Sequence, residues 1–182
     1  MCVCVCVCGC VIVPAQLDAA TCRLKPESDV LFGDVACGGS HTVACTLDSA
    51  GAEPEVYCCG DGSRGRLGRG DERDSWTPQP VSGLSPNLVL SHKRFSIVAV
   101  AAGASHSAAL SNRGELFTWG CGSGGKLGHG TADPEWEPKR VEALSGAHIA
   151  EVALGDHHTL ALDVDGDVYS WGRAAFGRLG HG

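Results

Sequence analysis

The chain has 182 residues, of which 43% are hydrophobic and 19% are charged, and its formal net charge is −7. This length and hydrophobic share suffice to bury a core and indicate one domain or little more. The acidic balance argues against the broad basic surface that non-specific nucleic-acid binding requires, so we expect no direct nucleic-acid partner. The 26 glycines are about twice average usage and indicate many tight turns.

Residues 1–34 are interpreted as a low-complexity Cys/Val start and leader that is not part of the fold. The run MCVCVCVCGCVIV is too short to span a membrane, since about 18 apolar residues are needed. It also lacks the basic region of a signal peptide, because the first basic residue is Arg23. Its Cys-x-Cys spacing suits soft metal ions, but no histidine or second cluster completes a ligand shell, so we expect no metal site.

The cysteines after this leader indicate where the protein works. Five remain, at uneven spacing, which is typical of a reduced intracellular protein rather than a secreted disulfide framework. We therefore expect a cytoplasmic or nuclear protein with no membrane partner. These cysteines are Cys37, Cys45, Cys58, Cys59 and Cys121.

Three tandem repeats follow the leader, at residues 35–99, 100–151 and 152–182, the last of them incomplete. Each opens with a Gly-x-x-His motif, continues with a hydrophobic hairpin pattern and ends in a glycine-rich loop. The motif histidines His41, His106 and His158 are 65 and 52 residues apart. A period with insertions explains this spacing.

Inside each copy the pattern is that of strands. The first copy stretches its hairpin loop at residues 48–55, and an insertion follows its connector at residues 85–96. In the second copy Gly114 provides the positive φ that its hairpin turn needs, and in the third Asp165-Gly166 is a hairpin signal. Proline-containing connectors at 75–84 and 134–144 fit edge strands, and no apolar stripe of helical period occurs. The fold is predicted to be all-β.

The motif order resembles the repeat of the regulator-of-chromosome-condensation family. It runs Gly-x-x-His-[Ser/Thr], hairpin, [Phe/Tyr]-x-Trp-Gly, glycine loop and Leu-Gly-[His/Arg]-Gly, and it covers about residues 35–182. The resemblance implies a partial β-propeller built from four-stranded antiparallel blades. Closed propellers need roughly 4 to 8 blades, so we expect a fragment of a longer protein or a chain that needs further blades or self-association.

The recurring glycines, histidines and tryptophans are interpreted as structural. We expect each histidine to make the same local hydrogen bond inside its own blade, and each tryptophan to pack between blades. The first copy has Cys59 where the others have tryptophan, so its packing should be weaker. These repeat positions are Gly38, His41, Gly60, Gly103, His106, Trp119, Gly120, Gly155, His158, Trp171 and Gly172.

No pattern predicts enzymatic activity or a cofactor. The segment GCGSGGKL at 120–127 approaches a phosphate-binding loop, but Leu127 lacks the hydroxyl that such a loop needs for Mg²⁺. The same glycine loop recurs in all three copies and is followed by another glycine turn rather than a helix. Scattered loop carboxylates have neither general acid-base pairing nor metal-site spacing. They are Asp61, Asp71, Asp74 and Asp133.

We predict a protein-interaction scaffold. The strongest local charge feature is an arginine cluster in the first glycine loop, interpreted as a solvated loop or as candidate contacts for an acidic partner. The family resemblance implies two alternatives: guanine-nucleotide exchange on a small Ran-like GTPase, or a repeat module of a larger protein such as a ubiquitin ligase. The candidate contacts are Arg64, Arg66, Arg69 and Arg73.

Overall fold

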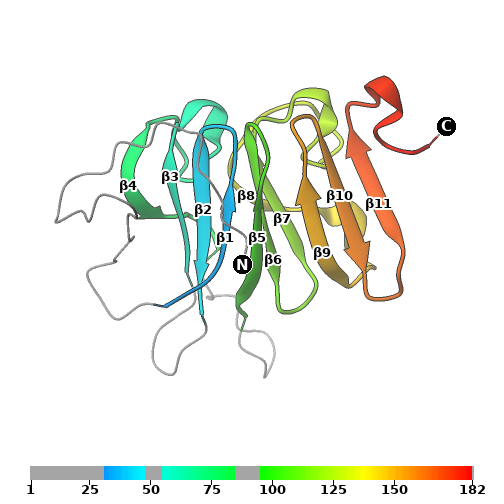
Figure 1. Cartoon of the computed structure of the whole chain (residues 1–182), viewed down its shortest axis with the longest axis horizontal. Helices are drawn as coiled ribbons and strands as arrows, with labels where there is room; N and C mark the ends of the chain where they lie inside the picture. Colours follow the sequence, from blue (N-terminus) through cyan, green and yellow to red (C-terminus); the bar gives the residue numbers. More distant parts are fainter. Residues whose placement is uncertain (1–30, 48–54, 85–94, 182) are drawn as a thin grey trace, which may run out of the picture.

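The structure is a computed structural model that describes residues 31–47, 55–84 and 95–181. Within these ranges the chain forms eleven β-strands and four short 3-10 turns, with no α-helix. The strands make three sheets in which every pairing is antiparallel and consecutive strands are neighbours. Figure 1 shows the sheets standing side by side, so each sheet is one blade.

The first two blades have four strands each, in chain order. The first contains β1 (Phe32–Cys37), β2 (His41–Thr46), β3 (Val56–Gly60) and β4 (Ser75–Pro80). The second contains β5 (Ile97–Ala102), β6 (His106–Ser111), β7 (Leu116–Gly120) and β8 (Glu135–Arg140). The prediction of an all-β fold with four-stranded antiparallel blades is confirmed by these two sheets.

The third blade has three strands among the residues that the structure describes. They are β9 (Ile149–Leu154), β10 (His158–Asp163) and β11 (Val168–Gly172), ordered β11-β10-β9. Short 3-10 turns follow the third strand of every blade: η1 (Ser63–Gly65), η2 (Ser123–Gly125) and η4 (Ala175–Gly177). The remaining turn, η3 (Glu142–Leu144), links the second blade to the third.

The sequence repeat and the blade coincide in register. His41 pairs with Gly60, His106 with Gly120 and His158 with Gly172, always between the second and third strands. One expectation needs correction: β1 begins at Phe32, so the leader assigned to 1–34 overlaps the fold by three residues. Residues 1–30, the stretched loop at 48–54 and the insertion at 85–94 lie outside the described residues.

Turn chemistry follows the residues that the sequence provides. Gly114 between β6 and β7 has φ +73°, and Gly166 between β10 and β11 has φ +94°, as predicted for both hairpins. The proline-containing segments form β4 and β8, which are the terminal strands of their sheets. Proline is tolerated there because an edge strand leaves one row of donors unused.

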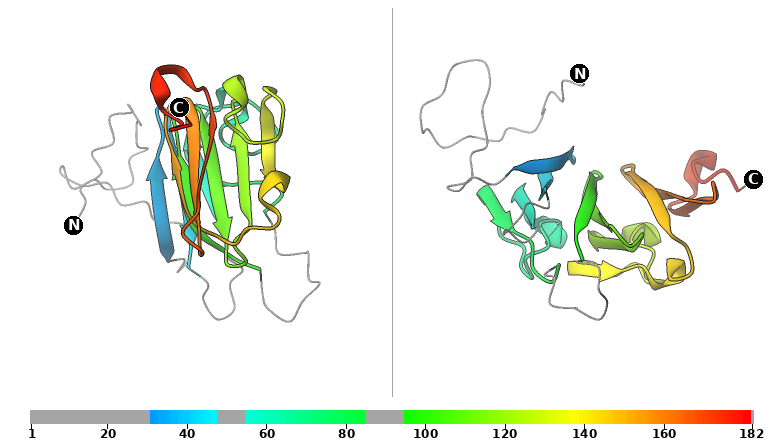
Figure 2. Two further views of the ribbon diagram at one scale, coloured as in Figure 1. Left: turned by 90° about the vertical axis from the view of Figure 1, so that its right-hand side faces the viewer. Right: turned by 90° about the horizontal axis from the view of Figure 1, so that it is seen from below.

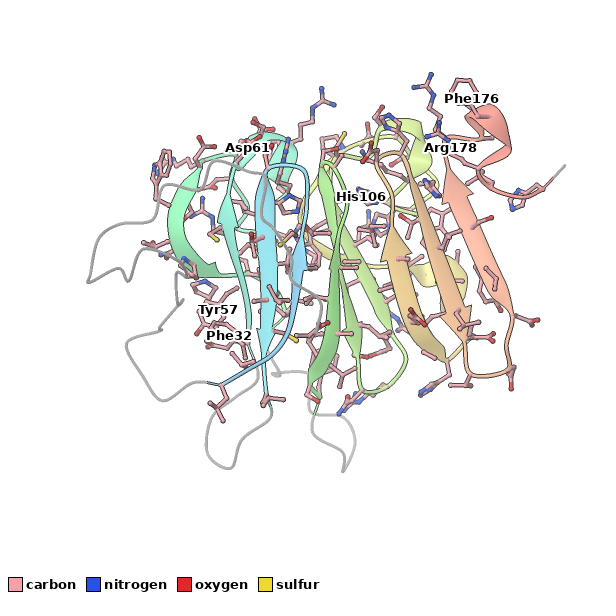
Figure 3. All side chains as sticks on the ribbon, in the orientation of Figure 1. Phe32, Tyr57, Asp61, His106, Phe176 and Arg178 are labelled. Atoms are coloured by element: carbon pink, nitrogen blue, oxygen red, sulfur yellow. The ribbon has the colours of Figure 1, made fainter. Side chains whose placement is uncertain are left out.

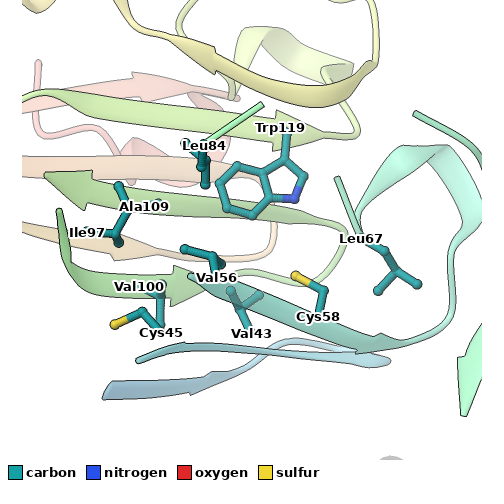
Figure 4. Close-up of a cluster of buried hydrophobic side chains, with 10 residues drawn as sticks. All are labelled: Val43, Cys45, Val56, Cys58, Leu67, Leu84, Ile97, Val100, Ala109 and Trp119. Carbon is teal, nitrogen blue, oxygen red and sulfur yellow. The ribbon is translucent and has the colours of Figure 1, made fainter. Parts of the chain in front are cut away.

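The core lies between blades rather than inside one sheet. One buried cluster joins β2 and β3 to β5, β6 and β7 and contains Trp119 (Figure 4). A second cluster joins the middle blade to β9 and β10. Every residue of β6 is buried because both faces of the middle blade are covered, whereas burial alternates along β10, which has one covered face. Figure 2 shows the resulting row of stacked sheets from two further sides.

Within the described part of the chain, no helix is long and apolar enough to cross a membrane.

Candidate functional site

The Gly-x-x-His motif is a tight turn in which the glycine lies against the imidazole. The Gly38 backbone N–H donates to the His41 carbonyl at 2.7 Å, and Gly103 does the same to His106 at 2.9 Å. A Cβ on Gly38 would lie 2.3 Å from His41 Cε1 and 2.6 Å from the Gly103 oxygen of the next blade. Only glycine fits here, because one of the clashing atoms is backbone.

His41 and His106 bond across the blade boundary, so the expectation of a hydrogen bond inside the blade is wrong for these two histidines. His41 Nε2 lies 2.7 Å from Ser107 Oγ of the second blade, and His106 Nε2 lies 3.0 Å from Thr159 Oγ1 of the third. Each of these two rings also packs against the glycine of its own turn, on the Cε1 and Nδ1 side.

The same boundary carries a shared carbonyl. The Arg66 carbonyl accepts hydrogen bonds from Ser107 Oγ at 2.9 Å and from Trp119 Nε1 at 3.0 Å. The Lys126 carbonyl likewise accepts from Thr159 Oγ1 at 2.8 Å and Trp171 Nε1 at 3.0 Å. The donors and acceptors come from successive blades. The tryptophans therefore connect blades through an indole hydrogen bond as well as through packing.

These bonds fix the protonation of the histidines. Each hydroxyl has a single proton, which it donates to the carbonyl, so a neutral imidazole must donate from Nε2. Burial is the main cause that lowers the pKa of His41 to about 4, with help from Arg66. Burial and Lys126 lower the pKa of His106 to about 3. Both rings are therefore neutral at physiological pH and serve as donors between blades rather than as acid-base groups.

The glycine loops gather at one end of the sheets. This surface, formed by residues 60–70, 120–130 and 172–181, is called the loop face. Figure 3 shows Asp61, Phe176 and Arg178 at this end, far from Phe32 and Tyr57. Gly60, Gly120 and Gly172 all have positive φ where each loop leaves its strand.

The tip of each loop has a left-handed backbone at an equivalent position. Arg64 has φ 60°, Gly124 has φ 77° and Phe176 has φ 63°. A non-glycine residue in this conformation is strained, and such strain tends to occur at functional positions. Phe176 is 97% exposed and has the Arg178 guanidinium 5.8 Å from its ring, so little packing in the described part of the chain compensates for its backbone.

The predicted arginine cluster divides into buried and exposed members. Arg66 is buried: its guanidinium forms an ion pair with Asp61 at 3.1 Å and donates to the Ser63 carbonyl at 2.9 Å. Its assignment as a candidate partner contact is therefore wrong. Arg69 donates to the Arg73 carbonyl and to Asp71 within its own loop. Arg64 and Arg73 are the exposed members.

The loop carboxylates fix the loop itself. Asp61 accepts from the Ser63 backbone N–H at 2.8 Å, and Asp74 accepts from the Gly62 N–H at 2.9 Å. No group of three or more His, Cys, Asp or Glu residues within the described ranges is placed to hold a metal ion.

The loop that resembled a phosphate site is occupied by its own side chains. Lys126 is 2% exposed and donates to Ser105 Oγ at 2.8 Å and to the Asp156 carbonyl at 3.3 Å. Its ammonium group thus links the second blade to the third. The single turn η2 is also too short to provide a helix N-terminus for phosphate.

Three stacked antiparallel blades joined by a repeated polar link define a β-propeller repeat protein. The regulator of chromosome condensation (RCC1) repeat model matches residues 54–110 and 113–162, and a second model of that repeat matches residues 34–66, 97–126 and 149–178. The chain belongs to this family, as the motif order indicated.

Similar proteins carry these repeats within longer chains. The chain is 38% identical over 136 residues to human E3 ubiquitin-protein ligase HERC2, covering 75% of this chain and 3% of that protein. It is 40% identical over 161 residues to human HERC3, a probable ubiquitin ligase, covering 88% and 14%. The Arabidopsis thaliana ultraviolet-B receptor UVR8 is 37% identical over 159 residues, covering 87% and 33%. The chain therefore spans a third or less of each of these relatives.

A solved structure agrees with the fold. Prp20p from Saccharomyces cerevisiae, studied for its binding to Gsp1p and histones, is 29% identical with a TM-score of 0.66, covering 81% of this chain and 34% of that chain. The part of the chain that the family models match is the repeat region, so the chain is a repeat module of the RCC1 type.

Proposed function

We propose that this module binds a partner protein through the loop face. The observation that carries the proposal is the strained backbone at equivalent loop tips, where two of three copies place a large exposed side chain, Arg64 or Phe176. Keeping such residues in a position that favours glycine costs stability, and contact with a partner gives a reason for the cost. Arg73 extends this surface with a second exposed cation.

A photo-crosslinking amino acid tests this surface. We would place p-benzoylphenylalanine at Phe176 in the full chain and, as a matched control, at Val164 in the β10–β11 turn at the opposite end of the sheets. Val164 is 61% exposed, so both probes face solvent. We expect discrete crosslinked proteins from position 176 and none from position 164. Equal labelling from both positions would contradict the proposal.

Guanine-nucleotide exchange is the second candidate for this surface. It is favoured by the structural similarity to Prp20p, whose binding to Gsp1p has been studied. The test is release of a fluorescent guanine nucleotide from a Ran-like GTPase, with and without this chain. Acceleration over buffer supports exchange, and release at the buffer rate removes it while leaving binding open to the crosslinking test.

We further propose that the repeats act as the interaction module of a larger protein, as in the ubiquitin ligases that they resemble. Such a protein would work in the cytoplasm or the nucleus, in keeping with the uneven spacing of the cysteines after residue 34. Full-length transcript sequencing tests the first point, because further repeats or an appended catalytic domain would be read directly. Imaging of the tagged protein tests the second.

A further inference from the structure

Cys121 occupies a loop position that holds an anion in the neighbouring blade. It follows Gly120 as Asp61 follows Gly60, and Lys126 corresponds to Arg66 five residues later. In the first blade the Asp61 carboxylate pairs with the Arg66 guanidinium at 3.1 Å. The second blade keeps the cation and replaces the carboxylate with a thiol.

The equivalence of the two cations extends to their other bonds. Arg66 Nη1 lies 3.4 Å from the Ala104 carbonyl of the second blade, and Lys126 Nζ lies 3.3 Å from the Asp156 carbonyl of the third. Both cations therefore lie under the next blade's turn. The thiol of Cys121 thus takes the place of the Asp61 carboxylate of the first blade, next to an equivalent cation, whereas the third copy has Arg173 at this position.

A second cation reaches Cys121 from the preceding blade. Arg64 Nη1 donates to Cys121 Sγ at 3.2 Å, across 57 positions of sequence. Arg64 is the residue with φ 60° at its loop tip. Arg64 is exposed whereas Cys121 is 4% exposed, so a solvent-facing side chain lies against the buried sulfur. Glu72, near Arg64, and Arg66, near Lys126, are the other charged groups that act on this cluster.

The electrostatics agree with this geometry. Burial opposes ionisation of the Cys121 thiol, but the Ser123 backbone N–H, Arg64 and Lys126 together lower its pKa below the usual value. Cys45 behaves oppositely, since burial raises its pKa to about 11. Burial also raises the pKa of Cys58. Cys45 and Cys58 can therefore serve as internal controls, because thiols with a raised pKa react slowly.

We propose that Cys121 is a nucleophilic thiolate site that small hydroperoxides oxidise. The thiolate sulfur attacks one peroxide oxygen, the S–O bond forms as the O–O bond breaks, and the leaving hydroxide or alkoxide takes a proton from water. Sulfur is oxidised by two electrons to a sulfenic acid, and the peroxide is reduced by the same two. The product has no full negative charge, so it holds Arg64 and Lys126 less strongly than the thiolate does.

The experiment measures the ionisation and the oxidation of the same residue in the folded full chain. Site-resolved mass spectrometry follows the iodoacetamide alkylation rate of Cys121, Cys45 and Cys58 against pH. We expect Cys121 to reach half of its plateau rate below about pH 8.5, the value of an unperturbed thiol, while Cys45 and Cys58 stay unmodified. Hydrogen peroxide followed by dimedone should then label Cys121 and leave the two reference cysteines unlabelled.

Matched variants separate ionisation from access. Arg64→Ala uncovers the sulfur, so the plateau rate should not fall, but the rate at pH 7 divided by the plateau rate should fall about threefold to tenfold. Arg64→Lys should restore part of this ratio, because it keeps the cation. Cys121→Asp reproduces the Asp61–Arg66 pair, so this variant should fold normally. It should give neither an iodoacetamide adduct nor a dimedone adduct at position 121.

Three outcomes would overturn the proposal. The first is half-plateau alkylation of Cys121 at or above the pH of a free thiol. The second is labelling of Cys45 and Cys58 at the same rate as Cys121, which would show reaction through unfolding. The third is a reactive Cys121 that gives no dimedone adduct after peroxide.

Discussion

His41 and Ser107 lie 66 residues apart in the sequence, and their side chains join two neighbouring blades through a 2.7 Å contact. The next boundary repeats the link through His106 and Thr159. The Ser107 hydroxyl in turn donates a hydrogen bond to the Arg66 carbonyl of the earlier blade. Two successive hydrogen bonds therefore connect the first blade to the second and the second back to the first. The Gly-x-x-His-[Ser/Thr] motif is therefore a device for stacking blades.

Acidification should destabilise these boundaries. The pKa of His41 is lowered to about 4 and that of His106 to about 3, whereas an unfolded histidine has a pKa near about 6.5. The unfolded state therefore binds more protons between these values, so stability is full above about pH 6.5 and falls as the pH drops. We expect the free energy of unfolding to decline by up to about 1.4 kcal/mol per pH unit for each histidine.

Urea unfolding at a series of pH values between neutral and mildly acidic measures this slope. The control is His41→Gln, whose amide can still donate to Ser107 but does not titrate. We expect the variant to be less sensitive to acid than the natural chain. An identical slope in both proteins would show that His41 does not cause the pH dependence.

Truncating Trp119 should be far more costly than truncating an exposed tryptophan. Trp119 is fully buried between the first two blades, and its indole donates to the Arg66 carbonyl. Trp119→Ala should lower the free energy of unfolding by about 3 to 5 kcal/mol. Trp76→Ala is the control, because Trp76 on β4 is 65% exposed and should cost less than about 1 kcal/mol. Similar losses for both variants, measured by urea unfolding, would contradict the proposed boundary.

The sequence was sufficient to predict the strands because their patterns are local. Hairpin glycines, proline-bearing edge strands and the register of the repeat all follow from spacing within one copy. Hydrogen-bond partners in another copy are not visible in such patterns. The expectation that His41 bonds inside its own blade failed for this reason, since its acceptor belongs to the following repeat.

The arginine cluster shows a similar limit. Charge spacing alone does not distinguish Arg64 from Arg66. Both reach the next blade, but Arg64 stays exposed whereas Arg66 is buried. Comparison of the copies could have found the difference. The position of Arg66 is also cationic in the other two repeats, as Lys126 and Arg178, whereas the position of Arg64 varies to Gly124 and Phe176.

A methyl group at Gly38 should disrupt the first boundary. Its Cβ would meet the His41 ring and the Gly103 carbonyl oxygen well inside contact distance, and the oxygen belongs to the backbone of the next blade. Gly38→Ala should therefore cost about 1 to 3 kcal/mol. Gly146→Ala is the matched control, since a Cβ there meets nothing within 4 Å. Thermal unfolding distinguishes the two, and equal melting temperatures would argue against the close approach.

Phe176→Gly should stabilise the chain while weakening partner binding. Glycine adopts φ 63° without the steric cost that an L side chain incurs there, so we expect a gain of about 0.5 to 1 kcal/mol in the free energy of unfolding. Little packing is lost because Phe176 is almost fully exposed, with the Arg178 guanidinium 5.8 Å from its ring.

Phe176→Ala separates the two contributions of this position. Alanine removes the ring but keeps the left-handed strain, so its stability should match that of the natural chain while binding is still lost. Urea unfolding gives the stabilities, and retention of proteins captured by crosslinking at Arg73 reports binding. If the glycine variant is both more stable and equally competent to bind, the strained loop tip has no role in recognition. Loss of binding in both variants would show that the partner contacts the ring. A stability gain only in the glycine variant would show that keeping a side chain at φ 63° costs stability.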